Sequence, residues 1–106
     1  MGYMRHHTII VTSGIDNLTE AHDKAVEFGN TCTEIYISPN NGYRTFIVIP
    51  DGSKEGWEES HNGDKARHQL RQWIREQAYE DGSNRFSWAE VMYGDEDGEL
   101  SVRGIR

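Results

Sequence analysis

The feature that most constrains the fold is a turn signal at residues 39–42 (Pro-Asn-Asn-Gly), which lies between two segments of strand character. Residues 32–38 and 43–49 are rich in β-branched and aromatic side chains, and 32–38 alternate in polarity. An Asn-Gly pair tolerates positive φ at both central positions of a tight turn. The sequence therefore predicts a β-hairpin in the middle of the chain, with antiparallel strands.

A strand and then a helix are predicted before the hairpin. Residues 6–12 form a strand signal, and their apolar run, residues 9–11 (Ile-Ile-Val), predicts burial on both faces at the centre of a sheet. Asn17 and Glu20 have capping-box spacing, and apolar residues then recur at helical intervals until Gly29. These signals predict a short amphipathic helix.

The same order is repeated after the hairpin. Helical periodicity over residues 64–80 predicts the main helix, with Gly82 as its stop. Residues 86–93 predict a fourth strand, and residues 100–105 predict an edge strand.

The order β-α-β-β-α-β, with a further strand, predicts one α+β domain over residues 1–106. It is the order of a ferredoxin-like two-layer sandwich, in which two helices cover one face of a mainly antiparallel sheet. The other sheet face is then left open. We expect Thr, Tyr, Trp and Met side chains on it, and faces of this kind pair into homo-oligomers or hold ligands.

Charge and cysteine usage limit the partners and the compartment. The chain has 18 acidic and 11 basic residues, a net charge of -7, and no basic patch, so direct nucleic-acid binding is not expected. No apolar run approaches membrane-spanning length, so no membrane association is expected. The single cysteine, Cys32, cannot form an internal disulfide, which favours the reducing cytoplasm.

A long connection, residues 50–64, precedes the main helix, and long connections are often functional. Residues 51–57 (Asp-Gly-Ser-Lys-Glu-Gly-Trp) resemble a phosphate-cradling loop, because the glycines expose N–H groups and Ser53 and Lys54 offer donors. The spacing and the nearby glutamates exclude a P-loop. The alternative is a simple turn, with Trp57 folded back onto the core.

Arg67, Arg71 and Arg75 repeat every four residues along the main helix. Like charges at this spacing destabilise an isolated helix by about a few tenths of a kcal/mol per pair. Either carboxylates of this acidic chain, such as Asp64, offset the repulsion, or an anionic ligand or partner does so. The sequence leaves both explanations open.

No metal, cofactor or catalytic set is predicted. The five histidines and Cys32 lack the spacing of a tetrahedral metal site, and no general base is placed beside Cys32. An acid–base role for His61 is the one enzymatic hypothesis, and the prediction leans towards a protein without catalytic activity.

Three segments resemble small, functionally unassigned proteins of tailed bacteriophages. They are residues 47–57 (Ile-Val-Ile-Pro-Asp-Gly-Ser-Lys-Glu-Gly-Trp), 79–83 (Tyr-Glu-Asp-Gly-Ser) and 88–95 (Trp-Ala-Glu-Val-Met-Tyr-Gly-Asp). The resemblance covers most of residues 6–97. It implies a phage-encoded protein that acts in the host cytoplasm, by binding, against host enzymes or defences.

Two functional hypotheses follow. In the first, the protein sequesters a small anionic ligand, such as a host nucleotide immune signal, in a pocket that an oligomer partner completes. The predicted ligand contacts are Tyr43, Ser53, Lys54, Trp57, His61, Asn62, Arg67, Arg71 and Arg75. In the second, the acidic surface, including residues 95–99, inhibits a host nuclease or nucleic-acid-binding protein by docking on its basic site.

Overall fold

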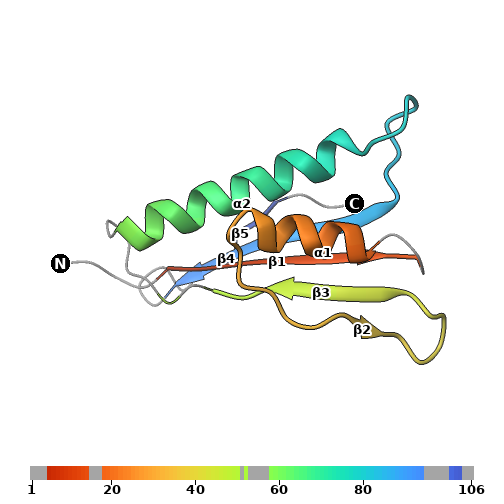
Figure 1. Cartoon of the computed structure of the whole chain (residues 1–106), viewed down its shortest axis with the longest axis horizontal. Coiled ribbons are helices and arrows are strands. Elements are labelled where there is room, and N and C mark those ends of the chain that lie inside the picture. The colour runs from red at the N-terminus through yellow and green to blue at the C-terminus, as the bar shows by residue number, and fades with distance from the viewer. Residues whose placement is uncertain (1–4, 15–17, 51, 53–57, 95–100, 104–106) are drawn as a thin grey trace.

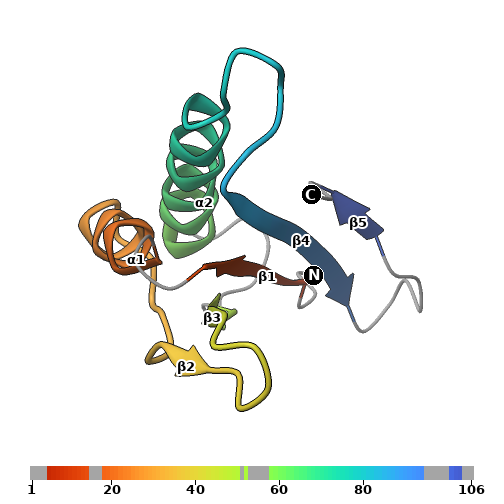
Figure 2. The ribbon, with the colours of Figure 1, turned by 90° about the vertical axis from the view of Figure 1, so that its right-hand side faces the viewer.

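The protein folds into one antiparallel sheet and two helices. The computed structural model describes residues 5–14, 18–50, 52, 58–94 and 101–103 (Figure 1). The elements follow in the order β1 (Arg5–Ser13), α1 (Leu18–Glu27), β2 (Tyr36–Ile37), β3 (Arg44–Val48), α2 (Glu58–Glu76), β4 (Phe86–Gly94) and β5 (Ser101–Arg103). Figure 2 shows both helices on the same face of the sheet. The predicted α+β class is confirmed.

The strand order is β2-β3-β1-β4-β5, and every neighbouring pair is antiparallel. β1 lies at the centre, as predicted: Ile9 pairs with Val48 of β3 on one side and with Glu90 of β4 on the other. The predicted burial on both faces is wrong, because Ile10 in the middle of the apolar run is 37% exposed. Within the described residues, neither helix is long and apolar enough to cross a membrane.

The core lies between the sheet and the helices. Successive residues of a strand point to opposite faces, so Ile9 and Val11 are fully buried under the helices whereas Ile10 between them is 37% exposed. Burial of each such side chain stabilises the fold by about 1.5–3 kcal/mol. The other core residues are Leu18, Ala21, Ala25, Phe46, Val48, Leu70, Ile74, Phe86 and Trp88.

The C-terminus of α1 is a Schellman motif. Gly29 has a φ of +103°, its N–H donates to the carbonyl of Val26 (2.9 Å), and the N–H of Asn30 donates to that of Ala25 (3.0 Å). The buried side-chain amide of Asn30 donates to the carbonyls of Ala25 and Ala66, so it joins the end of α1 to α2. The predicted glycine stop is confirmed.

The predicted bounds of the main helix are wrong at both ends. α2 begins at Glu58 rather than at residue 64, so residues 58–63 of the predicted connection are helical. The carboxylates of Glu58 and Glu59 lie in the first turn, where the helix dipole favours negative charge. Gly63 lies inside this helix, where a glycine costs only about 1 kcal/mol relative to alanine.

Gly82 does not end the helix, which stops at Glu76. With a φ of +88°, Gly82 belongs to a separate turn, in which the N–H of Tyr79 donates to the carbonyl of Ser83 (2.7 Å). The Ser83 hydroxyl and N–H both donate to the Asp81 carboxylate, and these hydrogen bonds lower the pKa of Asp81 below its ordinary value.

The predicted hairpin is confirmed, with a shorter first strand and a different turn. β2 covers only Tyr36 and Ile37. Cys32 pairs with Val48 and Tyr36 pairs with Thr45, so the first segment has one more residue than its partner between the two pairs. This extra residue interrupts the pairing, as in a β-bulge. Among the described residues, positive φ is confined to glycines, so Gly42 alone adopts it in the turn.

The sheet face away from the helices carries fewer large side chains than predicted. Trp and Met side chains were expected there, but the Trp and Met of β4 lie on the helix side: Trp88 is in the core, and Met92 lines a hollow under α2. Both residues are an even number of positions from Phe86, so all three side chains point to the same face of the sheet. Because Phe86 is buried in the core, that face is the one under the helices.

Candidate functional site

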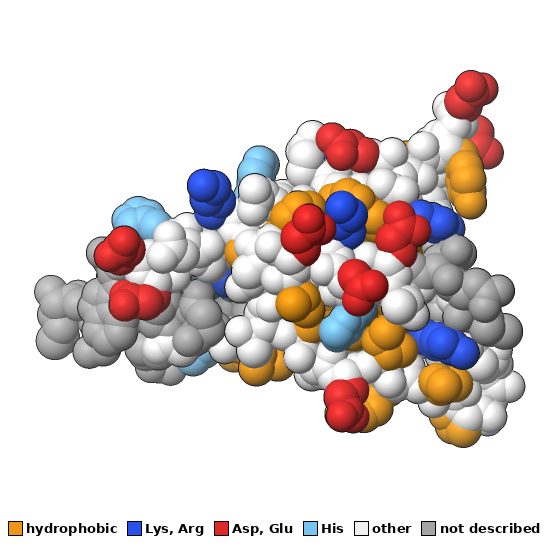
Figure 3. Space-filling view, viewed as in Figure 1, with side chains coloured by type: hydrophobic (Ala, Val, Ile, Leu, Met, Phe, Trp, Pro, Cys, Tyr) orange, Lys and Arg blue, Asp and Glu red, His pale blue; other side chains and the backbone are white. Residues whose placement is uncertain are grey.

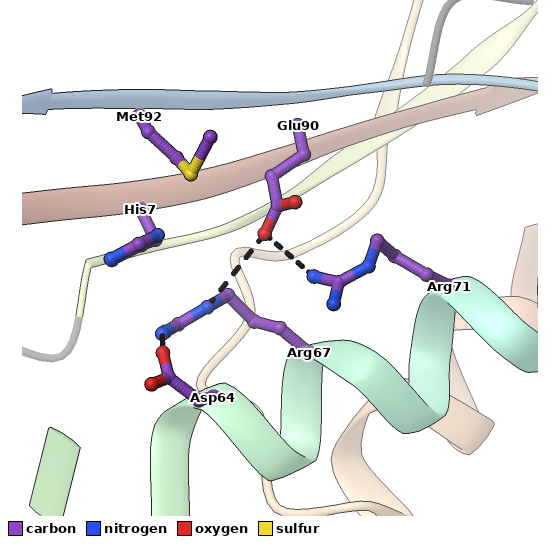
Figure 4. A pocket seen from close by; sticks show the side chains of 6 residues that line it. All are labelled: His7, Asp64, Arg67, Arg71, Glu90 and Met92. Carbon is purple, nitrogen blue, oxygen red and sulfur yellow. Dashed lines mark hydrogen bonds and ion pairs between the residues drawn. The ribbon is translucent and has the colours of Figure 1, made fainter. Parts of the chain in front are cut away.

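A hollow of about 240 Å³ lies between α2 and the sheet (Figure 4). Three elements supply its lining: β1 contributes His7, α2 contributes Asp64, Arg67 and Arg71, and β4 contributes Glu90 and Met92.

Secondary structure places these side chains together. Arg67 and Arg71 are four residues apart, which puts them on the same side of α2, and Figure 4 shows both pointing to the sheet. His7 pairs directly with Met92 across β1 and β4, and Glu90 lies two residues before Met92 on the same face. The hollow therefore depends on the docking of α2 onto the β1–β4 pair.

The charged groups form a connected cluster. Arg71 Nη1 donates to Glu90 Oε2 at 2.8 Å, and Arg67 Nε lies 3.9 Å from the same oxygen. Arg67 Nη2 also donates to Asp64 Oδ1. Glu90 therefore receives both arginines, while Asp64 contacts only Arg67 among the ion pairs of the described residues.

Burial divides the cluster into an inner and an outer part. The side chains of Glu90, Arg67 and Arg71 are 2%, 3% and 12% exposed, whereas that of Asp64 is 55% exposed. Among the described residues, the inner part holds two guanidinium groups and one carboxylate. The second carboxylate, that of Asp64, lies at the rim, where water screens its charge.

This arrangement is suited to binding a small anion. Guanidinium groups present planar forks of N–H donors that match carboxylate and phosphate oxygens. Pockets for drug-sized ligands usually measure about 300–1,000 Å³. The smaller hollow here suits a charged head group, with the remainder of a larger ligand outside.

The structure brings two of the predicted ligand contacts, Arg67 and Arg71, into this hollow. Their repulsion is offset by Asp64 and Glu90, as the carboxylate explanation predicted for Asp64. Arg75 lies further along α2, with its guanidinium carbon 5.4 Å from the ring centroid of Trp88.

The other predicted contacts lie elsewhere. His61 and Asn62 are exposed near the start of α2, and Asn62 lines a second hollow, of about 440 Å³, beside the end of α1. Tyr43 is 51% exposed at the hairpin, which Figure 1 shows at the opposite end of the molecule from the start of α2. The predictions for Ser53, Lys54 and Trp57 lie outside the described residues.

Sequence reasoning missed Glu90, His7 and Met92. A signal was present for Glu90: it alternates in phase with Phe86 and Trp88, so a charged residue occupies a position of apolar parity. His7 similarly shares the parity of Ile9. Their closeness to α2 depends on packing and could not be read from this pattern.

Cys32 and His22, which could act in catalysis or metal binding, have structural surroundings in the fold. Burial raises the pKa of Cys32 to about 11, so its thiol stays protonated at neutral pH. His22 Nε2 lies 2.9 Å from the carbonyl oxygen of Thr33, and its ring packs edge-on against Phe46. Over the described part of the chain, no group of three or more His, Cys, Asp or Glu residues is arranged to hold a metal ion.

The fold and the hollow define a small α+β protein with a buried arginine–glutamate cluster between helix and sheet. Comparison of the chain with protein-family models, curated proteins and solved structures found no match. The likeness to phage proteins stays a prediction, and the function rests on the geometry of the cluster.

Proposed function

We propose that this is a non-enzymatic binding protein that holds the charged group of a small anionic ligand between Arg67 and Arg71. The observation that carries the proposal is the pair of buried guanidinium groups, four residues apart on α2, that lines one hollow and meets at Glu90. An anion entering there gains charge-assisted hydrogen bonds in a region of low dielectric, where each is stronger than in water.

The two carboxylates have different parts in this mechanism. Asp64 is more than half exposed, so a ligand oxygen can replace it on Arg67 while its carboxylate returns to water. Glu90 is buried and stays in place, where it holds Arg71 and limits the repulsion between the arginines. Binding is therefore an exchange of one anion for another at Arg67.

A nucleotide is the ligand class that we propose to test first. A phosphate group fits the size of the hollow and accepts two hydrogen bonds from one guanidinium group. Sequestration of a nucleotide immune signal in the host cytoplasm, by a phage-encoded protein, is the biological form of this proposal.

We also assign the fold, as part of this proposal, to the ferredoxin-like sandwiches. The order β2-β3-β1-β4, antiparallel throughout, with α1 and α2 on one face, supports the assignment. β5 is then an addition at the edge beside β4.

Docking of an acidic surface on a basic host protein is the less supported function. Figure 3 shows carboxylates scattered among Lys, Arg, His and hydrophobic side chains on the face that it presents, without a continuous acidic patch. Lys24, for example, forms an ion pair with Glu27 at 3.2 Å. The acidic run at residues 95–99 lies outside the described residues.

Ligand titration of an Arg71→Lys variant tests the anion site. Lysine keeps the positive charge beside Glu90 but loses the fork of N–H donors, so we expect affinity for phosphate and 5′-AMP to fall by about 10- to 100-fold, the equivalent of one charge-assisted hydrogen bond. Calorimetry gives the affinities, and circular dichroism verifies the fold.

Lys65→Ala controls for a general effect of charge, because it removes one exposed positive charge from the same helix, outside the hollow, whereas Arg71→Lys keeps the net charge. It should bind as the wild type does. The proposal is wrong if neither phosphate nor 5′-AMP binds the wild-type protein, or if Arg71→Lys and Lys65→Ala weaken binding equally.

A further inference from the structure

We infer that the sheet face away from the helices is the interface of a symmetric homodimer. The inference does not depend on the anion site, because that hollow lies on the helix-covered side of the sheet. Figure 2 shows no described element over the open face.

The described residues of this face on the three longest strands carry no Asp, Glu, Lys or Arg, although 27% of the chain is charged. Strand alternation and pairing register identify them as His6, Thr8, Ile10, Thr12, Thr45, Ile47, Ser87, Ala89, Val91 and Tyr93. Ile10 and Tyr93 are 37% and 41% exposed. A water-exposed face without these charges is unusual in so polar a chain.

Three hydroxyl groups of this face, those of Thr8, Thr12 and Thr45, are already hydrogen-bonded within the protein. Thr12 and Thr45 bond to each other through their Oγ1 atoms at 2.8 Å, and Thr8 Oγ1 donates to the carbonyl of Val48 at 2.6 Å. Each of these oxygens therefore keeps a hydrogen-bond partner when a second copy covers it, which lowers the cost of removing these three side chains from water.

Charge identifies a second copy of the chain as the partner. Each copy has a net charge of -7, so an approach through charged surfaces brings like charges together. A two-fold axis through the open face places uncharged residues against uncharged residues. A basic protein would instead bind the acidic surfaces elsewhere, since this face offers it no carboxylate.

The dimensions of the face are sufficient for a weak dimer. Strands β1 and β4 have nine residues each, whereas β2, β3 and β5 have two, five and three. At about 3.3 Å per residue and 4.8 Å between strands, the described strands cover roughly 400 Å² per copy, about half of the usual value of about 800 Å². Dissociation in the micromolar range is therefore expected.

Sedimentation velocity over about 1 to 300 μM tests the interface, since that range brackets micromolar dissociation. We expect the wild-type protein to dimerise and both Ile10→Lys and Ser87→Lys to remain monomeric, because each substitution would bury one unpaired positive charge per copy in the interface. Ser87 is already exposed, so this variant decides the result if Ile10→Lys is misfolded by circular dichroism.

Val26→Lys is the matched control, because Val26 is 51% exposed on α1 and receives the same charge. It should dimerise as the wild type does. A wild-type monomer at the highest concentration overturns the inference, as does a dimer that persists in Ser87→Lys. Loss of the dimer in Val26→Lys would overturn it as well.

Discussion

Glu90 is the residue on which the site and the stability of the fold both depend. Its carboxylate is almost fully buried and receives Arg71 and Arg67. Buried ion pairs add little net stability when complete, but the loss of one partner leaves an uncompensated charge in a low dielectric.

Replacing Glu90 by alanine should therefore lower the free energy of unfolding by about 3–5 kcal/mol. Urea denaturation measures the change. Glu76→Ala, which removes an exposed carboxylate at the end of α2, is the control and should stay within about 0.5 kcal/mol of the wild type. A Glu90→Ala cost similar to that of the control would contradict the role given to this carboxylate.

Cys32 should be unreactive while the protein is folded. The thiolate is the nucleophile, and burial raises the thiol pKa from 9.0 to about 11. We expect iodoacetamide at pH 8 to modify Cys32 at least about tenfold more slowly in buffer than in urea, because a raised pKa lowers the thiolate fraction by that factor per unit. Equal rates would show that the thiol is not shielded.

The sign of the pH dependence follows from the same shift. The folded state holds the thiol proton more tightly than the unfolded state, so this contribution to stability is complete below pH 9 and is lost as the pH rises towards 11.

At the scale of elements, the ends of the two helices illustrate two kinds of signal. α1 ends at the glycine that predicted its end. The Schellman motif needs a residue with positive φ, and Gly29 adopts that conformation without help from the rest of the fold. α2 extends through Gly63, because the carboxylates before it and the packing of its apolar side outweigh one unfavourable residue.

Gly29→Ala should destabilise the protein by about 1–2 kcal/mol, the cost of placing a Cβ in the left-handed region. The nearest neighbour of that Cβ would be Ala66 Cβ at 3.9 Å, so the cost comes from the backbone and not from a clash. Thermal unfolding should show a midpoint lower by roughly 4–8 °C per kcal/mol.

Gly14→Ala is the control for this substitution. Gly14 lies outside the positive-φ region, and a Cβ there meets no atom within 4 Å, so no comparable loss is expected. Equal destabilisation in both variants would show that the effect is not specific to the Schellman motif.

At the scale of the whole molecule, the two faces of the sheet have opposite characters. The helix-covered face contains the buried charges, and the open face carries none among its described residues on β1, β3 and β4. A dimer through the open face would leave both proposed anion sites on its outer sides. The net charge of -7 repels anions at long range, so the proposed binding requires that contacts inside the hollow outweigh this repulsion.

The sequence by itself determined the order of elements, the α+β class, the central position of β1 and the hairpin. It also indicated the contact between Asp64 and Arg67, because residues three apart on a helix are neighbours. All these features depend on periodicity or on local backbone preference, which short segments carry independently of their surroundings.

Only the tertiary structure decided what lies in the hollow. His7, Glu90 and Met92 come from strands that are distant from α2 in sequence, and their meeting with Arg67 and Arg71 depends on strand register and on helix docking. Tyr43 and His61 were assigned to one ligand site, yet they lie at opposite ends of the molecule. Sequence spacing measures distance along one element, whereas a site formed by several elements depends on how they pack.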